Sequence, residues 1–316
     1  MIFDLIKIAA QVGLLYVPLI LGIYLAMGVL SLPDLTLQGS FGLGGSLAAV
    51  LLVNGAPPIL SVLGGMALGS IAGLITATLH LKLRMNVLLA SILVATASYS
   101  GCLIVMGSGN ISLAGHATAF SWANDLGLNN QWATILAGAL IALLVSGLLL
   151  WFLRTDYGMS LVASGQNIQT ARGLGIRTEN RQLVGLMIAN ALAACSGALV
   201  VHNQGFMDVT IQTTVIVIGL AGMMIGLALV RSGRVAPTIL ALIGGALIYR
   251  FAVATTLQLG LNPNLLQLIT AALVILVIWA RYNSRSVLSL FSPKVRHERR
   301  QLQARYYEED RVASFI

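Results

Sequence analysis

Long apolar runs separated by short polar breaks dominate this sequence. The runs are about 20 residues long, which is the length that an α-helix needs to cross roughly 30 Å of hydrocarbon. Of the 316 residues, 58% are hydrophobic and only 9% are charged, whereas about a quarter of the residues of a soluble domain are charged. The alternating segments of a membrane barrel are absent, and lipid tolerates no open sheet. The sequence therefore predicts an all-α polytopic membrane protein.

Nine candidate transmembrane helices account for these runs. They are Ile8–Leu30, Leu35–Val53, Pro58–His80, Val87–Met106, Trp132–Leu153, Leu183–His202, Val215–Val230, Ala236–Leu257 and Leu265–Ala280. The first run is too long for the apolar core of a signal peptide, so we expect one retained helix there. We expect a membrane domain over residues 1–282 and a cytoplasmic tail over residues 283–316.

Basic residues are distributed unevenly around these segments. If the polar stretch after the fifth segment and the C-terminal tail are cytoplasmic, only Lys7 and Arg250 of the 18 Lys and Arg residues lie elsewhere. Cytoplasmic loops carry an excess of Lys and Arg, so this count predicts an external N-terminus and a cytoplasmic C-terminus. The same distribution explains the net charge of +8 without a nucleic-acid partner.

The chain also repeats itself. The run Asp34-Leu-Thr-Leu-Gln38 reappears as Asp208-Val-Thr-Ile-Gln212, and later glycine pairs and Asn-Leu runs follow in the same order. Segments one to four (about 8–107) thus correspond to segments six to nine (183–281). Five crossings separate the partners, so the copies have opposite topology, an inverted repeat. Chance similarity between apolar helices is the alternative, but matching polar positions favour the repeat.

Polar residues within or beside the segments are candidates for a solute pathway, because polar groups are costly in a membrane. Inverted repeats also place transport sites at glycine-interrupted helices, and the second segment is one. The predicted pathway residues are Asp34, Thr36, Gln38, Gly39, Ser40, Asn86, Tyr99, Asn110, Asn190, Gln204, Asp208 and Gln212. Each polar residue alone is equally explained by a helix cap or an interhelical hydrogen bond, and each glycine by close helix packing. No metal-site spacing is present, so we expect no metal.

The longest internal polar stretch, residues 155–182, lies between the fifth and sixth segments. Leu161, Val162, Ile168, Ala171 and Leu174 recur there at roughly helical spacing, with glycines between them. The pattern predicts two short helices beneath the membrane. Because a solvated linker does not need such a pattern, we interpret the stretch as a docking surface for a cytoplasmic partner.

Motifs in this stretch resemble the coupling loop of ABC importer permeases of the branched-chain amino acid and ribose permease superfamily. The matching residues are Gly165, Asn167, Ala171, Arg172, Gly175 and Ile176, and the basic residue Arg177 follows them. Asp34-Leu-Thr-Leu-Gln-Gly-Ser40 and Gly205-Phe-Met-Asp208 resemble two further blocks. The similarity is greatest to a subgroup paired with lipoprotein-type solute receptors, some linked to aromatic amino acids.

This resemblance implies a bacterial inner-membrane importer of a small polar solute, an amino acid. It implies a homodimer of the permease, two cytoplasmic ATPase subunits that bind ATP and Mg²⁺, and an extracellular or periplasmic solute-binding protein. The chain has no GxxxxGK[ST] loop, so ATP hydrolysis belongs to a partner, and HExxH and GxSxG are absent too. The alternatives are an ion-coupled secondary transporter, an enzyme with a membrane aspartate pair, and a channel subunit.

Overall fold

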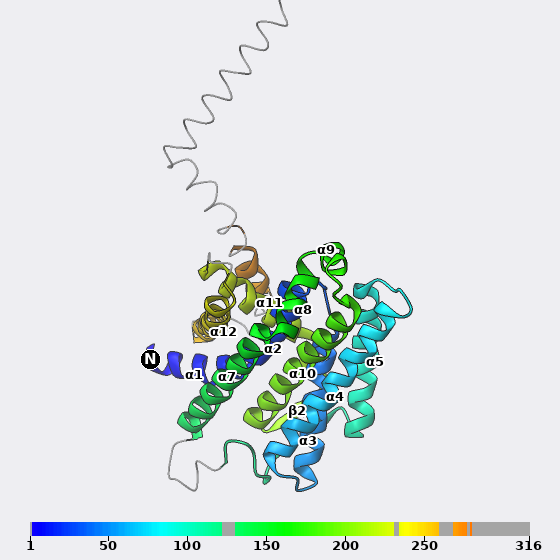
Figure 1. Cartoon of the computed structure of the whole chain (residues 1–316). Coiled ribbons are helices and arrows are strands. Elements are labelled where there is room, and N and C mark those ends of the chain that lie inside the picture. Colours follow the sequence, from blue (N-terminus) through cyan, green and yellow to red (C-terminus); the bar gives the residue numbers. More distant parts are fainter. Residues whose placement is uncertain (1, 122–129, 231–233, 259–267, 277–278, 280–316) are drawn as a thin grey trace, which may run out of the picture. The chain divides into compact units, whose positions relative to one another are not determined.

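The apolar runs form helices that begin or end at glycines, prolines and polar caps. The computed structural model describes residues 2–121, 130–230, 234–258, 268–276 and 279. The elements are α1 (Ile2–Leu15), α2 (Val17–Ile23), the π-helical turn η1 (Tyr24–Val29), α3 (Thr36–Val53), α4 (Pro58–Leu81), α5 (Val87–Met106), β1 (Asn110–Ser112), α7 (Asn130–Arg154), α8 (Asp156–Gln166), α9 (Ile168–Gly173), α10 (Thr178–Gln204), β2 (Phe206–Asp208), the 3₁₀ turn η2 (Val209–Ile211), α11 (Gln212–Leu229) and α12 (Val235–Gln258) (Figure 1).

Seven helices in the described part of the chain are long and apolar enough to cross a membrane, and an eighth span results if α1 and the bent stretch after it count as one. The all-α polytopic class is therefore confirmed, whereas the number of nine stays a prediction. The ninth predicted segment, residues 265–280, lies partly outside the described residues, which are helical over 268–276. The chain divides into a unit of residues 1–271 and a second unit from 272 onwards. The predicted tail lies outside the described residues.

The first segment differs from its prediction. One helix was expected over residues 8–30, but α1 and the stretch that follows it meet at an angle of 49°. Pro18 stands in the first turn of α2, where its missing N–H cannot continue the hydrogen bonds of α1. The chain then widens into the π-helical turn η1, and the Leu30 N–H donates to the Leu25 carbonyl at 3.0 Å.

Helices α3, α4 and α10 pack closely against one another. A Cβ atom added at Gly197 of α10 would collide with the carbonyl of Phe41 in α3, and one added at Gly44 would collide with the backbone of Ala194. In the same way, Gly65 of α4 lies against the backbone of Gly44. Small residues let membrane helices approach this closely, so dispersion contacts replace the hydrophobic effect that is missing in lipid.

A two-stranded sheet joins two distant connections. Strand β1 follows α5, and β2 follows α10; they pair antiparallel with Asn110 opposite Asp208. The loop containing α8 and α9 precedes α10, whose 27 residues extend about 40 Å. The sheet and the α8–α9 loop therefore lie at opposite ends of α10 (Figure 1).

Candidate functional site

The carboxylate of Asp34 is completely buried where α3, α4 and α10 meet. The side-chain amide of Asn190 donates to Asp34 Oδ2 at 2.7 Å, and the Thr36 N–H donates to Oδ1 at 2.8 Å. The Ser40 hydroxyl in turn donates to Asn190 Oδ1 at 2.7 Å. Burial raises the pKa of the Asp34 carboxyl, and these hydrogen bonds oppose the rise. Four of the predicted pathway residues thus form one packed network.

Thr76 of α4 completes this network, and the sequence reasoning did not select it. Its hydroxyl lies 2.6 Å from the hydroxyl of Thr36, and it also donates to the Ala72 carbonyl at 3.2 Å. A signal was available, because Gly65, Gly69 and Gly73 recur every four residues and mark the face of α4 that packs inward. Thr76 follows Gly73 by three residues and shares that face.

A second cluster lies at the β1–β2 end of the protein. The Thr210 N–H and hydroxyl both donate to Asp208 Oδ1, at 2.7 and 2.5 Å. Asn110 donates to the other carboxylate oxygen at 3.5 Å. The bonds from Thr210 lower the pKa of the Asp208 carboxyl. Gln204, exposed at the end of α10, stands just before this strand.

The two aspartates form the same local turn. In each case the carboxylate accepts the N–H of the threonine two residues later, Thr36 for Asp34 and Thr210 for Asp208. Their surroundings differ, since Asp34 is fully buried and Asp208 is partly exposed. The turns agree with the proposed repeat at one point, and the inverted repeat itself stays a prediction.

The remaining predicted pathway residues are dispersed. Gln212 is buried beside Gly42, and its Nε2 has no hydrogen-bond partner among the described residues. Gly39 packs against Ser98 of α5. Asn86 is exposed and caps α5 by accepting the Leu88 N–H at 2.9 Å.

Tyr99 stands on the outer face of α5 with 38% of its surface exposed, and Gln38 of α3 is half-buried. A single chain therefore does not bring all the predicted pathway residues together.

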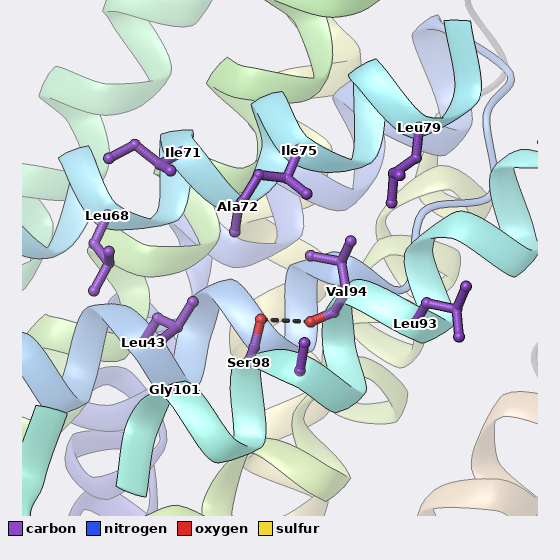
Figure 2. A pocket seen from close by; sticks show the side chains of 11 residues that line it. Leu43, Leu68, Ile71, Ala72, Ile75, Leu79, Leu93, Val94, Ser98 and Gly101 are labelled. Carbon is purple, nitrogen blue, oxygen red and sulfur yellow. Dashed lines mark hydrogen bonds between the residues drawn. The ribbon is translucent and has the colours of Figure 1, made fainter. Parts of the chain in front are cut away.

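An apolar groove of about 390 Å³ lies between α4 and α5, with Leu43 of α3 also in its lining. Figure 2 shows Leu68, Ile71 and Ile75 on one side of the groove and Leu93 and Val94 on the other. Ser98 is the one lining side chain with a polar atom, and its hydroxyl is occupied by donating to the Val94 carbonyl at 2.7 Å. Such a lining suits acyl chains better than a polar solute.

The two short helices predicted in the polar stretch are α8 and α9, and each begins at a side-chain cap. Thr155 accepts the Gly158 N–H at 3.1 Å, and Asn167 accepts the Thr170 N–H at 3.0 Å. After α9 the chain turns at Gly175, whose φ of +79° favours glycine. Leu174 beside it is 75% exposed. The loop thus presents an apolar side chain and open backbone at its tip.

The polar residues of this loop bond mostly within it, while two of its small residues face inward. Arg172 donates to the Thr178 hydroxyl at 3.1 Å and approaches Glu179 at 3.7 Å. Arg177 is exposed and Ile176 half-buried. Ala171 is buried, and Gly165 lies directly against the carbonyl of Val29. The exposed tip, rather than Gly165 or Ala171, is available to a partner.

Together, the bundle of apolar helices and this projecting loop define a polytopic membrane protein. The chain belongs to the family described as branched-chain amino acid transport system, permease component, whose model matches residues 5–278. The predicted family is thereby confirmed, and the family description is that of a transport-system permease.

Three relatives show the range of the similarity. The tyrosine transport system permease protein of Clostridioides difficile is 34% identical over 81% of this chain and 84% of its own length. An uncharacterised protein of Rickettsia prowazekii is 30% identical over 83% and 92%. A probable branched-chain amino acid transport permease protein, LivH, of Methanocaldococcus jannaschii is 30% identical over 74% and 75%. No solved structure matches this chain.

Proposed function

We propose that this chain is the membrane-spanning subunit of an ATP-driven ABC importer, which moves an amino acid from an external binding protein to the cytoplasm. The family and the relative named for tyrosine transport support the transport class and the kind of solute. The observation that carries the proposal is the α8–α9 loop, which is ordered by two caps and exposes Leu174 at its tip. In a loop between spans, an exposed leucine beside two glycines suits a protein contact.

The proposed partner at this tip is the ATPase that binds ATP and Mg²⁺. Space is open around Gly173 and Gly175, so another backbone can approach them closely. Arg177 is exposed at the rim, and Arg172 is held toward Glu179. Leu174 would fill an apolar groove of the ATPase, with these charges at the rim of the contact.

Two copies of the chain would enclose one pathway. The outer face of α5 exposes Thr96, Tyr99 and Ser100 among leucines, and polar side chains at membrane depth usually face water or a protein partner rather than lipid. A second copy on this face would place both sets of polar groups beside a shared route. Two loops then serve two ATPases, and a C2 arrangement of the subunits follows.

The orientation in the proposal is an external N-terminus and a cytoplasmic α8–α9 loop. The distribution of Lys and Arg supports it, and the pairing of β1 with β2 puts both strands on the side opposite to the loop, because α7 and α10 provide an even number of crossings between them. Gly173→Cys should react with a membrane-impermeant maleimide only from the cytoplasm, and Gln204→Cys only from outside. Labelling of Gly173→Cys in intact cells would contradict the orientation.

The transport proposal is tested by uptake in cells of the source organism that carry a tagged copy in place of the native gene. Radiolabelled tyrosine should enter at a rate that depends on the chain and on ATP, and it should continue when ion gradients are collapsed but ATP is supplied. Uptake that follows the ion gradient instead would identify a secondary transporter, and flux without ATP would identify a channel. An inert radiolabelled sugar serves as the control solute.

The loop contact has its own test within the same cells. Leu174→Ser should reduce the ATPase that co-purifies with the tagged chain, whereas Gln169→Ser, an exposed polar position on α9, should leave it unchanged. Equal retention of the ATPase in both variants would show that the tip is not the docking element.

A further inference from the structure

Helix α8 packs tightly onto the end of the first membrane segment. Gly165 lies against the carbonyl of Val29 and the Cα of Leu30, so even one methyl group there would strike backbone atoms. Leu30 is buried, and its side chain lies with that of Leu161 of α8 over Gly185 of α10. A displacement of α8 therefore acts directly on residues 29 and 30.

The chain reverses direction immediately after this contact. The Leu32 N–H donates to the Ala26 carbonyl at 2.9 Å, Ser31 has a φ of +58°, and Pro33 follows. A positive φ in a residue other than glycine is unfavourable, and Pro33 restricts the next position. Residues 29–34, which we name the strap, thus form a short and stiff connection.

The strap ends at the Asp34 network. Asp34 is the last residue of the strap. Its carboxylate accepts one hydrogen bond from Asn190 of α10 and one from the N–H of Thr36, the first residue of α3. Ser40, one turn further along α3, bonds to the same Asn190. The strap is therefore attached to α8 at one end by backbone contact and to α3 at the other by buried hydrogen bonds.

We propose that the strap carries ATPase-driven movement from α8 to α3, with Asp34 as the positioning residue that holds α3 to it. This inference rests on the proposed function, because it assigns the internal route by which the α8–α9 loop acts. With Asn190 as its partner, position 34 requires a carboxylate for a geometric reason. Both of its oxygens accept, one from Asn190 and one from Thr36, and an amide would turn a donor toward one of these donors.

The first test compares two helical glycines. Gly165→Ala should strike the carbonyl of Val29, whereas Gly147→Ala meets open space on α7, away from the proposed ATPase contact. In tagged cells we expect Gly165→Ala to lower tyrosine uptake about tenfold while the ATPase still co-purifies. Gly147→Ala should transport as the wild type does. Equal uptake in the two variants would overturn the contact between α8 and the strap as the route.

The second test exchanges the two side chains at the other end. Asp34→Asn places donor against donor, and Asn190→Asp places two carboxylates together, so each should lose about tenfold in uptake. The double variant Asp34→Asn with Asn190→Asp restores a donor facing an acceptor, and Ser40 still finds an acceptor. Recovery of uptake in the double variant is expected, and its failure while the protein stays membrane-inserted and monodisperse would overturn the role of Asp34.

Hydrogen exchange separates this inference from the proposed function. In the purified chain, Gly165→Ala should raise amide exchange in the strap and in the first turn of α3, and Gly147→Ala should not. Unchanged exchange would overturn the mechanical link whatever is transported. Absence of chain-dependent uptake in the wild type would instead overturn the proposed function, with the exchange result still judging the strap.

Discussion

Replacing Gly197 by alanine should destabilise the protein, although alanine is the better helix former. Alanine is favoured over glycine inside a helix by about 1 kcal/mol, and this gain applies equally at Gly147, where an added Cβ would meet nothing. At Gly197 the added Cβ would lie 2.8 Å from the carbonyl carbon of Phe41 and closer still to its oxygen. Overpacking of this kind costs about 1–3 kcal/mol. The two variants should therefore differ in stability by about 1–3 kcal/mol.

The comparison is made on purified protein in detergent, with unfolding followed by the loss of the monodisperse peak after heating. Gly147→Ala should unfold at or slightly above the wild-type temperature, and Gly197→Ala should unfold below it. Because both substitutions add the same methyl group to a helix, their difference reports packing alone. Equal unfolding temperatures would refute the backbone contact between α3 and α10.

Three further outcomes are expected. Ser61→Ala removes the hydroxyl 2.9 Å from Nε2 of the buried His202, so it should lower stability by about 1–3 kcal/mol, measured by thermal unfolding. Asn167→Ala removes the cap of α9, which should cost about 1 kcal/mol and raise amide exchange in that helix. Hydrogen bonds lower the pKa of the Asp208 carboxyl in the folded protein. The ionised carboxylate therefore stabilises the fold fully above the ordinary pKa of aspartate, and this stabilisation is lost as the pH falls through the lowered pKa of the folded state. The gap in unfolding temperature between wild type and Asp208→Asn should thus narrow in acid.

The positions of several membrane helices were predicted closely from the hydropathy of the sequence. The predicted segment Val87–Met106 matches α5 at both ends, and Pro58–His80 ends one residue before α4 does. Length and apolar content decide these elements, and both are local properties of the sequence. The bend near Tyr16 was missed because the apolar run continues on both sides of Pro18, and hydropathy alone does not show where a helix bends within such a run.

The pairings within the candidate site were beyond sequence reasoning. Asp34 and Asn190 were each selected for polarity, yet 156 residues separate them, and only the packing of α3 against α10 shows that they bond. In the α8–α9 loop, helical spacing identified Ala171 as a patterned position but not the side on which it is buried. Pattern gives the period of a helix, whereas tertiary contacts choose which neighbour covers each face.

The separation between Asp34 and Asn190 also sets a delay during synthesis. A ribosome that adds about 5–20 residues per second needs about 8–30 s to make the 156 residues between them. During that interval α3 and α4 are made while the carboxylate of Asp34 has no amide from α10 to accept. A nascent chain must therefore keep this region at the aqueous boundary or within the insertion machinery until α10 arrives, and fragments that stop before Asn190 should be cleared by membrane proteases.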